Sequence, residues 1–437
     1  MKIKILIILF AFAFSPANAQ KQWTLQECIR YAKERNITVK MQSVSQQNQE
    51  IRLNTAKNQR LPNLSSNVNQ TFSFGRGASP ADNSYQSLNS LSTSLSVSTS
   101  MPLFTGFQIP NNIAAAKFDL QAAIADFEKA KEDIELAVIS AYLQILYNKE
   151  LLEITQNQQT LSARQLERIE ELYRLGRTAE AQVYEIKSQK ANDELAVVQA
   201  KNDLQLSILT LTQLLELPSP EGFDIEAPNI DADLILLSNP EQTYANALTT
   251  RASIRAEEYR LASSEKTVEV AKSAYFPQLS FGAGYSNNYY KINGFNNSPF
   301  TQQLKNNESK YIGFSLNIPV FNRFETRNNI RAAKLNVKNQ ELQLENIKKN
   351  LYKEIQQAYY NATGAREKYK SAEIALESTK KAYEFAKEKF ENGRSTTYEF
   401  NDASNNLMKA SANLSQAKYD YVFRKKILDF YNGLREE

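Results

Sequence analysis

The sequence predicts a mainly helical, exported protein that also carries membrane-spanning β-strands, built from two copies of one strand, strand and long-helix unit. Three observations support this fold class: a secretory leader at the N-terminus, a tandem internal repeat, and four short segments in which apolar and polar side chains alternate. The repeat matters most, because a duplicated unit determines how every other pattern in the chain is interpreted.

Residues 1–19 have the pattern of a secretory signal peptide. Two lysines precede an apolar run over residues 5–14, and Ala17-Asn18-Ala19 follows as an A-x-A cleavage site. The run is about half of the roughly 20 residues that a membrane-spanning helix needs, so a transmembrane anchor is the weaker interpretation. We expect cleavage after Ala19 to leave Gln20 as the first residue, where there is no cysteine to carry a lipid.

The composition argues against an enzyme. The chain has no histidine, which is the commonest general base and metal ligand, and its one cysteine, Cys28, cannot form an intramolecular disulfide. The sequence contains no G-x-S-x-G motif, phosphate-binding loop or Cys/His cluster. Its 52 basic and 48 acidic residues give a net charge of +4, which offers no electrostatic case for nucleic-acid binding. The sequence therefore predicts no catalytic site, no bound metal and no cofactor.

The two halves of the chain repeat each other. Lys117 and Lys334 end matching segments and are 217 residues apart (334 − 117 = 217), and the same offset relates the other matched pairs. A constant offset means that no insertion separates the halves along these stretches, which indicates a tandem duplication. The matched segments are Met101-Pro-Leu-Phe-Thr-Gly-Phe107 with Ile318-Pro-Val-Phe-Asn-Arg-Phe324, Ala141-Tyr142 with Ala358-Tyr359, and Gly176-Arg177 with Gly393-Arg394.

Each half contains the same predicted elements in the same order. The first repeat covers residues 20–217 and the second covers residues 241–437, and an acidic, proline-rich linker over residues 218–240, expected at an equatorial position, joins them. The predicted elements are a helix over residues 25–55, a β-hairpin over residues 64–101 and helices over residues 113–175 and 179–215 in the first repeat, then a helix over residues 241–273, a β-hairpin over residues 279–318 and helices over residues 327–392 and 397–432 in the second.

The longest helices show a coiled-coil pattern. Each covers roughly sixty residues or more and would be about 95 Å long at 1.5 Å per residue. Apolar residues keep the 3-4 spacing of a coiled-coil seam from Leu351 to Phe390. Ala375 and Ala382 lie off the main stripe, so this helix could contact neighbours on two sides, as in a ring of helices. An ordinary antiparallel bundle or coiled-coil scaffold would show the same pattern.

The strands distinguish these alternatives. Between Leu91 and Met101, apolar or threonine side chains alternate with serines, which puts the two kinds on opposite faces. Lipid on one side and an aqueous lumen on the other would require this division. The smallest membrane barrels have eight strands, so a spanning chain with four would assemble with copies of itself, and three copies would supply twelve. The serines expected to face the lumen are Ser92, Ser94, Ser96 and Ser98.

With these features the chain resembles the TolC family of outer-membrane efflux and secretion ducts over essentially its whole mature length. The motifs that carry the resemblance are the duplication, Pro102-Leu-Phe-Thr-Gly106 and Pro319-Val-Phe-Asn-Arg323 at the strand-to-helix passages, and the two Gly-Arg turns. The resemblance implies a homotrimer with a twelve-stranded β-barrel in the outer membrane of a Gram-negative bacterium, continued by a twelve-helix α-barrel across the periplasm. It also implies a passive conduit in a tripartite efflux or type I secretion system, which works with a periplasmic adaptor (a membrane fusion protein) and an inner-membrane transporter.

The resemblance also implies functional residues. In the family, acidic side chains just past the second turn ring the closed periplasmic entrance, and by position these are Glu399 and Asp402. Their counterparts in the first copy are Gln182 and Glu185. The alternative is that Glu399 and Asp402 are ordinary first-turn acids, which a helix N-terminus favours. The tip turns would either contact the adaptor or be solvated: Gly176, Arg177, Gly393 and Arg394.

Two departures from the family pattern fall in the opening helices. Asn36 precedes Ile37 where the family often has a proline, and Ala252 follows Arg251 where a proline is frequent. We expect these departures to affect local helix geometry more than the fold. The second functional hypothesis is a periplasmic coiled-coil scaffold or adaptor without a pore. The cargo, whether drugs, metal ions or secreted proteins, is not encoded in any of these patterns.

Overall fold

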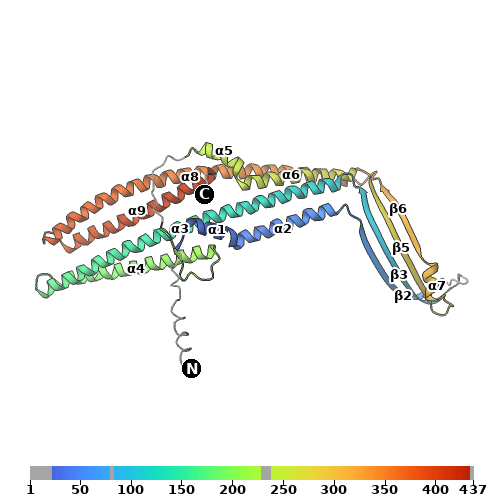
Figure 1. Cartoon of the computed structure of the whole chain (residues 1–437), viewed down its shortest axis with the longest axis horizontal. Coiled ribbons are helices and arrows are strands. Elements are labelled where there is room, and N and C mark those ends of the chain that lie inside the picture. Colours follow the sequence, from blue (N-terminus) through green and yellow to red (C-terminus); the bar gives the residue numbers. More distant parts are fainter. Residues whose placement is uncertain (1–21, 79–82, 228–237, 434–437) are drawn as a thin grey trace, which may run out of the picture. The chain divides into compact units, whose positions relative to one another are not determined.

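The computed structural model describes residues 22–78, 83–227 and 238–433, and within them the chain is mainly helical, which confirms the predicted helical class (Figure 1). The predicted signal peptide and residues 228–237 of the predicted linker lie outside the described residues. The chain forms two compact units: Met1–Val44, Asp126–Ile254 and Ile347–Glu437 make up the first, and Ser45–Ala125 and Arg255–Asn346 make up the second.

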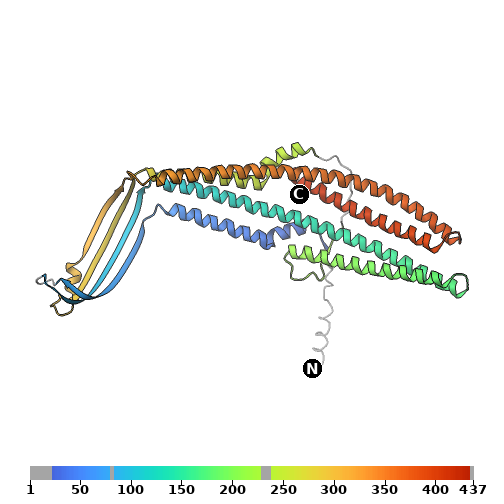
Figure 2. The same cartoon turned by 180° about the vertical axis from the view of Figure 1, so that it is seen from behind.

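An antiparallel sheet of four strands, in the order β2-β3-β5-β6, lies in the second unit. Figures 1 and 2 show the four strands side by side, with β2 and β6 at the two open edges. The central pair, β3 and β5, joins the hairpin of the first repeat to the hairpin of the second. The strands are β2 (Asn63–Ala78), β3 (Tyr85–Phe104), β5 (Gln278–Ile292) and β6 (Ser309–Asn317).

A short helix, α7 (Phe300–Asn306), protects the part of β5 that extends past β6. β6 pairs with β5 only as far as Ser286. Beyond that point the Gln303 side chain accepts a hydrogen bond from Tyr290 N (2.9 Å) and donates one to Tyr290 O (2.9 Å). Asn307 Nδ2 donates to Asn288 O of β5 (2.6 Å). Side-chain amides therefore satisfy an edge that would otherwise expose unpaired backbone groups.

The helices form two antiparallel hairpins, α3 with α4 and α8 with α9, together with two shorter helix pairs (Figures 1 and 2). α3 and α8 occupy equivalent positions in the two repeats and contain 67 residues each. The helices are α1 (Leu25–Arg35), α2 (Ile37–Asn58), α3 (Gln108–Arg174), α4 (Glu180–Leu214), α5 (Pro240–Thr250), α6 (Ala252–Lys272), α8 (Glu325–Glu391) and α9 (Thr397–Tyr431).

The first opening helix is broken at Asn36, which corrects the predicted single helix over residues 25–55. Asn36 has a ψ of 134°, outside the helical range. Its side chain accepts a hydrogen bond from Thr38 N (2.9 Å) and donates one to Leu214 O (3.0 Å). An asparagine side chain that bonds to nearby backbone in this way competes with the helix, so the break needs no proline.

The second opening helix is broken at Arg251, which corrects the predicted single helix over residues 241–273. Arg251 has a ψ of 128°. Its guanidinium group lies 3.3 Å from the Glu132 carboxylate of α3 and 4.0 Å from the centre of the Phe430 ring of α9. Only 11% of the Arg251 side chain and 7% of the Glu132 side chain are exposed. A buried ion pair of this kind holds its geometry, because separating the charges in a dry site is costly.

The core of the first unit lies where α1, α3 and α4 pack together. Cys28 is fully buried there, which is common for a free cysteine because it packs as a small hydrophobic residue. Among the described residues, Tyr142 and Tyr421 are the largest of the fully buried side chains. The core includes Cys28, Ile29 and Ala32 of α1, Val138, Tyr142 and Ile145 of α3, Leu211 of α4 and Val422 of α9.

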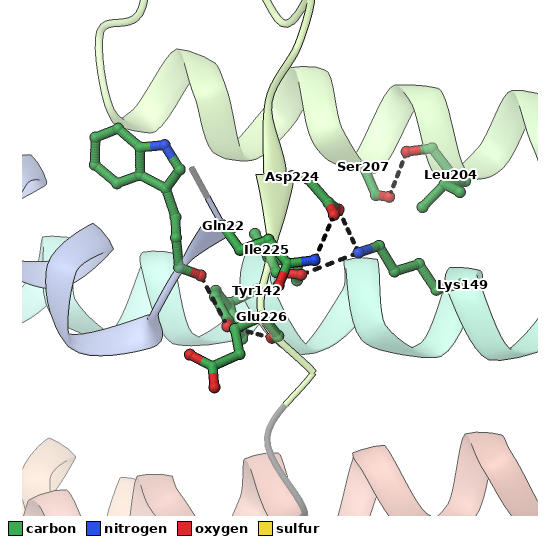
Figure 3. Close-up of polar contacts among 9 residues, drawn as sticks. Gln22, Tyr142, Lys149, Leu204, Ser207, Asp224, Ile225 and Glu226 are labelled. Carbon is green, nitrogen blue, oxygen red and sulfur yellow. Dashed lines mark hydrogen bonds and ion pairs between the residues drawn. The ribbon is translucent and has the colours of Figure 1, made fainter. Parts of the chain in front are cut away.

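Tyr142 holds a small parallel pair of strands, β1 (Gln22–Trp23) and β4 (Asp224–Ile225), against α3 (Figure 3). Its hydroxyl lies 2.6 Å from Glu226 O and 3.1 Å from Trp23 O. Burial raises the pKa of Tyr142, so the hydroxyl keeps the proton that it donates to these carbonyls. One side chain thus connects the start of the first repeat to the linker that follows it.

Lys149, two turns further along α3, contacts the same pair of strands (Figure 3). Its ammonium group pairs with the Asp224 carboxylate and donates to Ile225 O (3.1 Å). Gln22 Nε2 also donates to Asp224 (3.0 Å). Although partial burial opposes it, hydrogen bonding from Lys149 and Gln22 holds the pKa of Asp224 below its usual value. Asp224 therefore stays ionised at neutral pH and keeps the pair of strands attached.

We predict that Tyr142→Phe loosens β1 and β4. Removal of the hydroxyl leaves the Glu226 and Trp23 carbonyls without the hydrogen bonds that it donates, which should cost about 0.5–1.5 kcal/mol of local stability. Faster amide hydrogen exchange in β1 and β4 is the expected result. Tyr359→Phe is the matched control, because Tyr359 occupies the equivalent position of the second repeat but is only half-buried. Equal exchange in the two variants would contradict this role of Tyr142.

Candidate functional site

The strand register gathers polar side chains from all four strands on one surface, here called the polar face. Ser98 lies opposite Ser65 of β2 and Gly284 of β5, and Gly284 lies opposite Tyr311 of β6. The hydroxyls of Ser65 and Ser98 are 3.1 Å apart. The polar face comprises Ser65, Asn67, Asn69, Thr71 and Ser73 of β2, Ser90, Ser92, Ser94, Ser96, Ser98 and Ser100 of β3, Ser280, Gly282, Gly284, Ser286, Asn288 and Tyr290 of β5, and Ser309, Tyr311, Gly313 and Ser315 of β6. All four serines named from the sequence, Ser92, Ser94, Ser96 and Ser98, belong to it.

The opposite surface of the sheet, here called the apolar face, exposes large hydrophobic side chains. Leu64 and Ile312 are each 78% exposed, and Phe314 is 70% exposed. Exposed apolar patches on this scale are typical of contact with lipid or with a partner. The apolar face includes Leu64, Val68 and Phe72 of β2, Leu91, Leu95 and Val97 of β3, Leu279 and Phe281 of β5, and Ile312, Phe314 and Leu316 of β6.

A sharp backbone turn marks the passage from β3 into α3 and explains the glycine of the first Pro-Leu-Phe-Thr-Gly motif. Gly106 and Phe107 both have positive φ, at 62° and 68°. A Cβ atom on Gly106 would lie 2.5 Å from Ser273 O, so only glycine fits. In the second repeat Arg323 and Phe324 have the same conformation, with φ of 54° and 64°. The duplicated motif therefore encodes a backbone turn.

The two Gly-Arg turns end the long helices with the same cap. Gly176 has a φ of 71° and Gly393 a φ of 69°. Arg177 N donates to Leu172 O of α3 (2.8 Å), and Arg394 N donates to Lys389 O of α8 (2.8 Å). This hydrogen bond and the left-handed glycine define a Schellman cap, which explains the glycines without reference to a partner. The Arg177 and Arg394 side chains are exposed.

Glu399 forms a capping box at the start of α9. Its backbone N–H donates to Thr396 Oγ1 (3.2 Å), and its carboxylate accepts from Thr396 N (3.2 Å) and from the Ser395 hydroxyl (2.5 Å). The Ser395 hydroxyl, followed by the Thr396 N–H, holds the pKa of Glu399 below its usual value. Glu399 therefore has the helix-start role that was the alternative interpretation of this residue, and it remains an exposed negative charge.

Asp402 lies one turn further along α9 and is also exposed. It accepts a hydrogen bond from Asn406 Nδ2 (3.1 Å). It also lines a groove of about 930 Å³ between α8 and α9, whose other wall includes Ala375 and Ala382. These are the two alanines whose position off the seam predicted a second neighbour. The sequence counterparts of Glu399 and Asp402, Gln182 and Glu185, lie at the start of α4.

A buried polar network, which the sequence did not reveal, connects the two helical hairpins. Ser404 of α9 donates to Gln158 Oε1 of α3 (3.0 Å). Gln189 of α4 donates to the buried Asp193 carboxylate (2.8 Å) and to Asn405 Oδ1 of α9 (3.1 Å). Polar residues at seam positions are the only signal for it in the sequence, and they do not identify the partner helix. The members of the network on α9, Ser404 and Asn405, follow closely after Asp402 in the sequence.

The described part of the chain offers neither a group of metal ligands nor a membrane-spanning helix. Among residues 22–78, 83–227 and 238–433, no three histidine, cysteine, aspartate or glutamate side chains are grouped so as to bind a metal ion. Over the same residues, no helix combines the length and the apolar character needed to cross a membrane.

Comparison with known proteins identifies the family. The model of the family described as outer membrane efflux protein matches residues 28–216 and 243–431, which correspond to the two repeats and cover most of the chain. The chain belongs to the outer membrane efflux protein family. This membership confirms the TolC-type resemblance, the predicted class of outer-membrane channel and the predicted location in the outer membrane.

Individual known proteins are similar to this chain over most of their length. The chain is 23% identical to the outer membrane protein TolC of Vibrio cholerae over 71% of this chain and 70% of that protein. It is 23% identical to the toxin and drug export protein A of Aggregatibacter actinomycetemcomitans over 75% of this chain and 69% of that protein. The CmeC outer membrane channel of Campylobacter jejuni superposes with a TM-score of 0.76 at 18% identity, over 94% of this chain and 87% of that one, which shows a shared fold. The second of these proteins is named for export and the third as a channel.

Proposed function

We propose that three copies of this chain form a passive, water-filled conduit that leads from a periplasmic adaptor and inner-membrane transporter, across the outer membrane, to the exterior. The observation that carries the proposal is the division of one open sheet into a polar face and an apolar face, aligned across strands from both repeats. Lipid against the apolar face and water against the polar face would satisfy both surfaces.

The open edges of the sheet support assembly into a closed barrel. β2 and β6 each have one unpaired edge. In the hydrocarbon region of a bilayer, an unpaired strand edge costs several kcal/mol for each unsatisfied group, so the edges must meet. Four strands are too few for closure, whereas three copies bring β2 of one chain beside β6 of the next and supply twelve. The apolar face would then form a continuous lipid-facing belt.

Exposed apolar side chains on the helices support the continuation of the assembly as a helical tube. On α4, Tyr184 is 62% exposed, Leu195 is 65% exposed and Val198 is 66% exposed. Tyr184 and Leu195 are 11 residues apart, as are Leu195 and Leu206, and this spacing keeps side chains on one face of a nearly straight helix. Such a stripe, together with the alanine-lined groove between α8 and α9, suits contact with helices of neighbouring copies.

The turns after α3 and α8 are the proposed contacts for the adaptor. Their caps are built from backbone bonds, so the exposed Arg177 and Arg394 side chains are available for a partner. The relative named for toxin and drug export supports a cargo class that includes toxins and drugs. Energy would come from the inner-membrane transporter, because a passive conduit supplies none.

Glu399 and Asp402 are the proposed negative ring at the periplasmic mouth. Threefold symmetry would bring three copies of each exposed carboxylate toward one axis. Between low-dielectric walls these charges would concentrate cations and repel anions. The competing interpretation, a periplasmic coiled-coil scaffold, leaves the exposed apolar face of the sheet without an explanation.

We predict a trimer that conducts ions. Mass measurement in mild detergent should give about three times the mature mass, and the same preparation should produce discrete current steps in a planar bilayer. The trimer follows from four strands per chain and the need to close the sheet. A heat-denatured sample provides the monomer reference. A membrane-inserted monomer that conducts no current would contradict the proposal.

We predict alternating reactivity along β3. Single-cysteine variants at Ser94 and Ser96, made after replacement of the buried Cys28, should react with a water-soluble thiol reagent in intact membranes. Variants at Leu95 and Val97 should resist the reagent, because successive strand side chains face opposite sides. Detergent-solubilised, denatured protein, in which all positions should react, is the control. A uniform profile in membranes would exclude β3 as a wall between lipid and water.

We predict that removal of the charges of Glu399 and Asp402 lowers cation selectivity. Glu399→Gln is preferred to alanine, because a glutamine can keep the capping box that glutamate forms, whereas loss of the cap would cost about 0.5–2 kcal/mol. Combined with Asp402→Asn, it should shift the reversal potential toward zero in a salt gradient and weaken block by trivalent cations.

The matched control for this experiment is Glu185→Gln in the first repeat, which should have a smaller effect. Trimer mass should be unchanged in every variant. If the reversal potential and the sensitivity to trivalent cations equal those of the wild type, Glu399 and Asp402 are helix-start acids without a role in the pore.

A further inference from the structure

A tyrosine ring lies directly over a glycine in the middle of the polar face. Gly284 of β5 and Tyr311 of β6 are opposite each other in the strand register. A Cβ atom on Gly284 would lie 2.5 Å from Tyr311 Cε1, 2.8 Å from Cζ and 3.0 Å from Oη. These distances leave no room for any side chain at position 284, so the ring occupies the space that a side chain would fill. Gly284 has no positive φ, which excludes a backbone reason for glycine.

The side chains around Tyr311 are small. Along the same rung of the sheet, Gly284 is paired with Ser98, and the next rung towards the helices contains Ser100, Gly282 and Gly313. On the other side, the neighbouring rung contains Asn67, Ser96, Ser286 and Ser309. Tyr311 is therefore the largest side chain on this part of the polar face, and its orientation decides how far the surface projects.

This orientation matters if the polar face lines a bore. Twelve strands about 4.8 Å apart and tilted by about 40° would enclose a backbone radius of roughly 12 Å. Three tyrosine side chains directed toward the axis would take up much of that space. The same rings laid against the wall would leave the bore open. Glycine within a strand costs roughly 0.5–1 kcal/mol relative to alanine, so its presence beneath the ring needs a compensating reason.

We propose that Gly284 is a positioning residue that keeps the Tyr311 ring flat against the wall and thereby sets the width of the conduit at this level. The inference rests on the proposed function, in which the polar face borders water. The proposal assigns the bore width to one pair of residues, Gly284 and Tyr311. It therefore predicts which sizes of cargo can pass. A side chain at position 284 would lift the ring from the wall and move it toward the axis.

The test compares single-channel conductance of four variants with that of the wild type. Gly284→Ala should lower the conductance and reduce the size of the largest poly(ethylene glycol) that enters the channel. Adding Tyr311→Ala to Gly284→Ala should restore both values, because no ring remains to be displaced. Tyr311→Ala alone should change the conductance little, since the ring already lies against the wall. Gly313→Ala is the matched control, because a Cβ atom there meets nothing within 4 Å on the same face.

Several outcomes would overturn the inference. Equal conductance of the wild type and Gly284→Ala would do so, as would a loss that persists after Tyr311 is removed. A large rise in the conductance of Tyr311→Ala alone would mean that the ring already projects into the bore, and this measurement decides the matter even if Gly284→Ala fails to form trimers. A wild type without channel activity would instead contradict the proposed function, so the two failures are distinguishable.

Discussion

Backbone pairing between β3 and β5 is the interaction on which the sheet depends, because these strands come from different halves of the duplicated chain. The pairing runs from Ser90 to Phe104 of β3, with one irregularity between Pro102 and Phe104, at the end of the strand. Because side chains alternate along a strand, a slip by one residue would move Leu95 and Val97 to the side of the serines. A surface for lipid and a surface for water exist together only in the observed register.

The duplication preserved backbone conformation more closely than side-chain chemistry. Both strand-to-helix passages contain two successive residues with positive φ, although glycine occupies the first position in one repeat and Arg323 occupies it in the other. Both long helices end in the same left-handed cap. By contrast, Tyr142 is a buried anchor for β1 and β4, whereas its counterpart Tyr359 is only half-buried. The two repeats therefore share geometry while they carry different contacts.

Polar contacts determine where the helices of the first unit bend and how they pair. The break at Asn36 depends on side-chain hydrogen bonds to the backbone, and the break at Arg251 depends on a buried ion pair with Glu132. A third set, around Asp193, links α3, α4 and α9. Buried polar groups are costly when they lose their partners, so these contacts disfavour other arrangements of the helices.

The sequence by itself determined the duplication, the helical class, the alternation of the strands and the family, because each depends on local periodicity or on matching motifs within the chain. It also located the serines of the polar face and the glycines of the two caps. The breaks at Asn36 and Arg251, the helix α7, the network around Asp193 and the contact between Gly284 and Tyr311 were decided only by tertiary structure. The physical reason is common to all of them: each depends on which residue, far away in the chain, comes within a few ångströms, and periodicity within one segment carries no information about that partner.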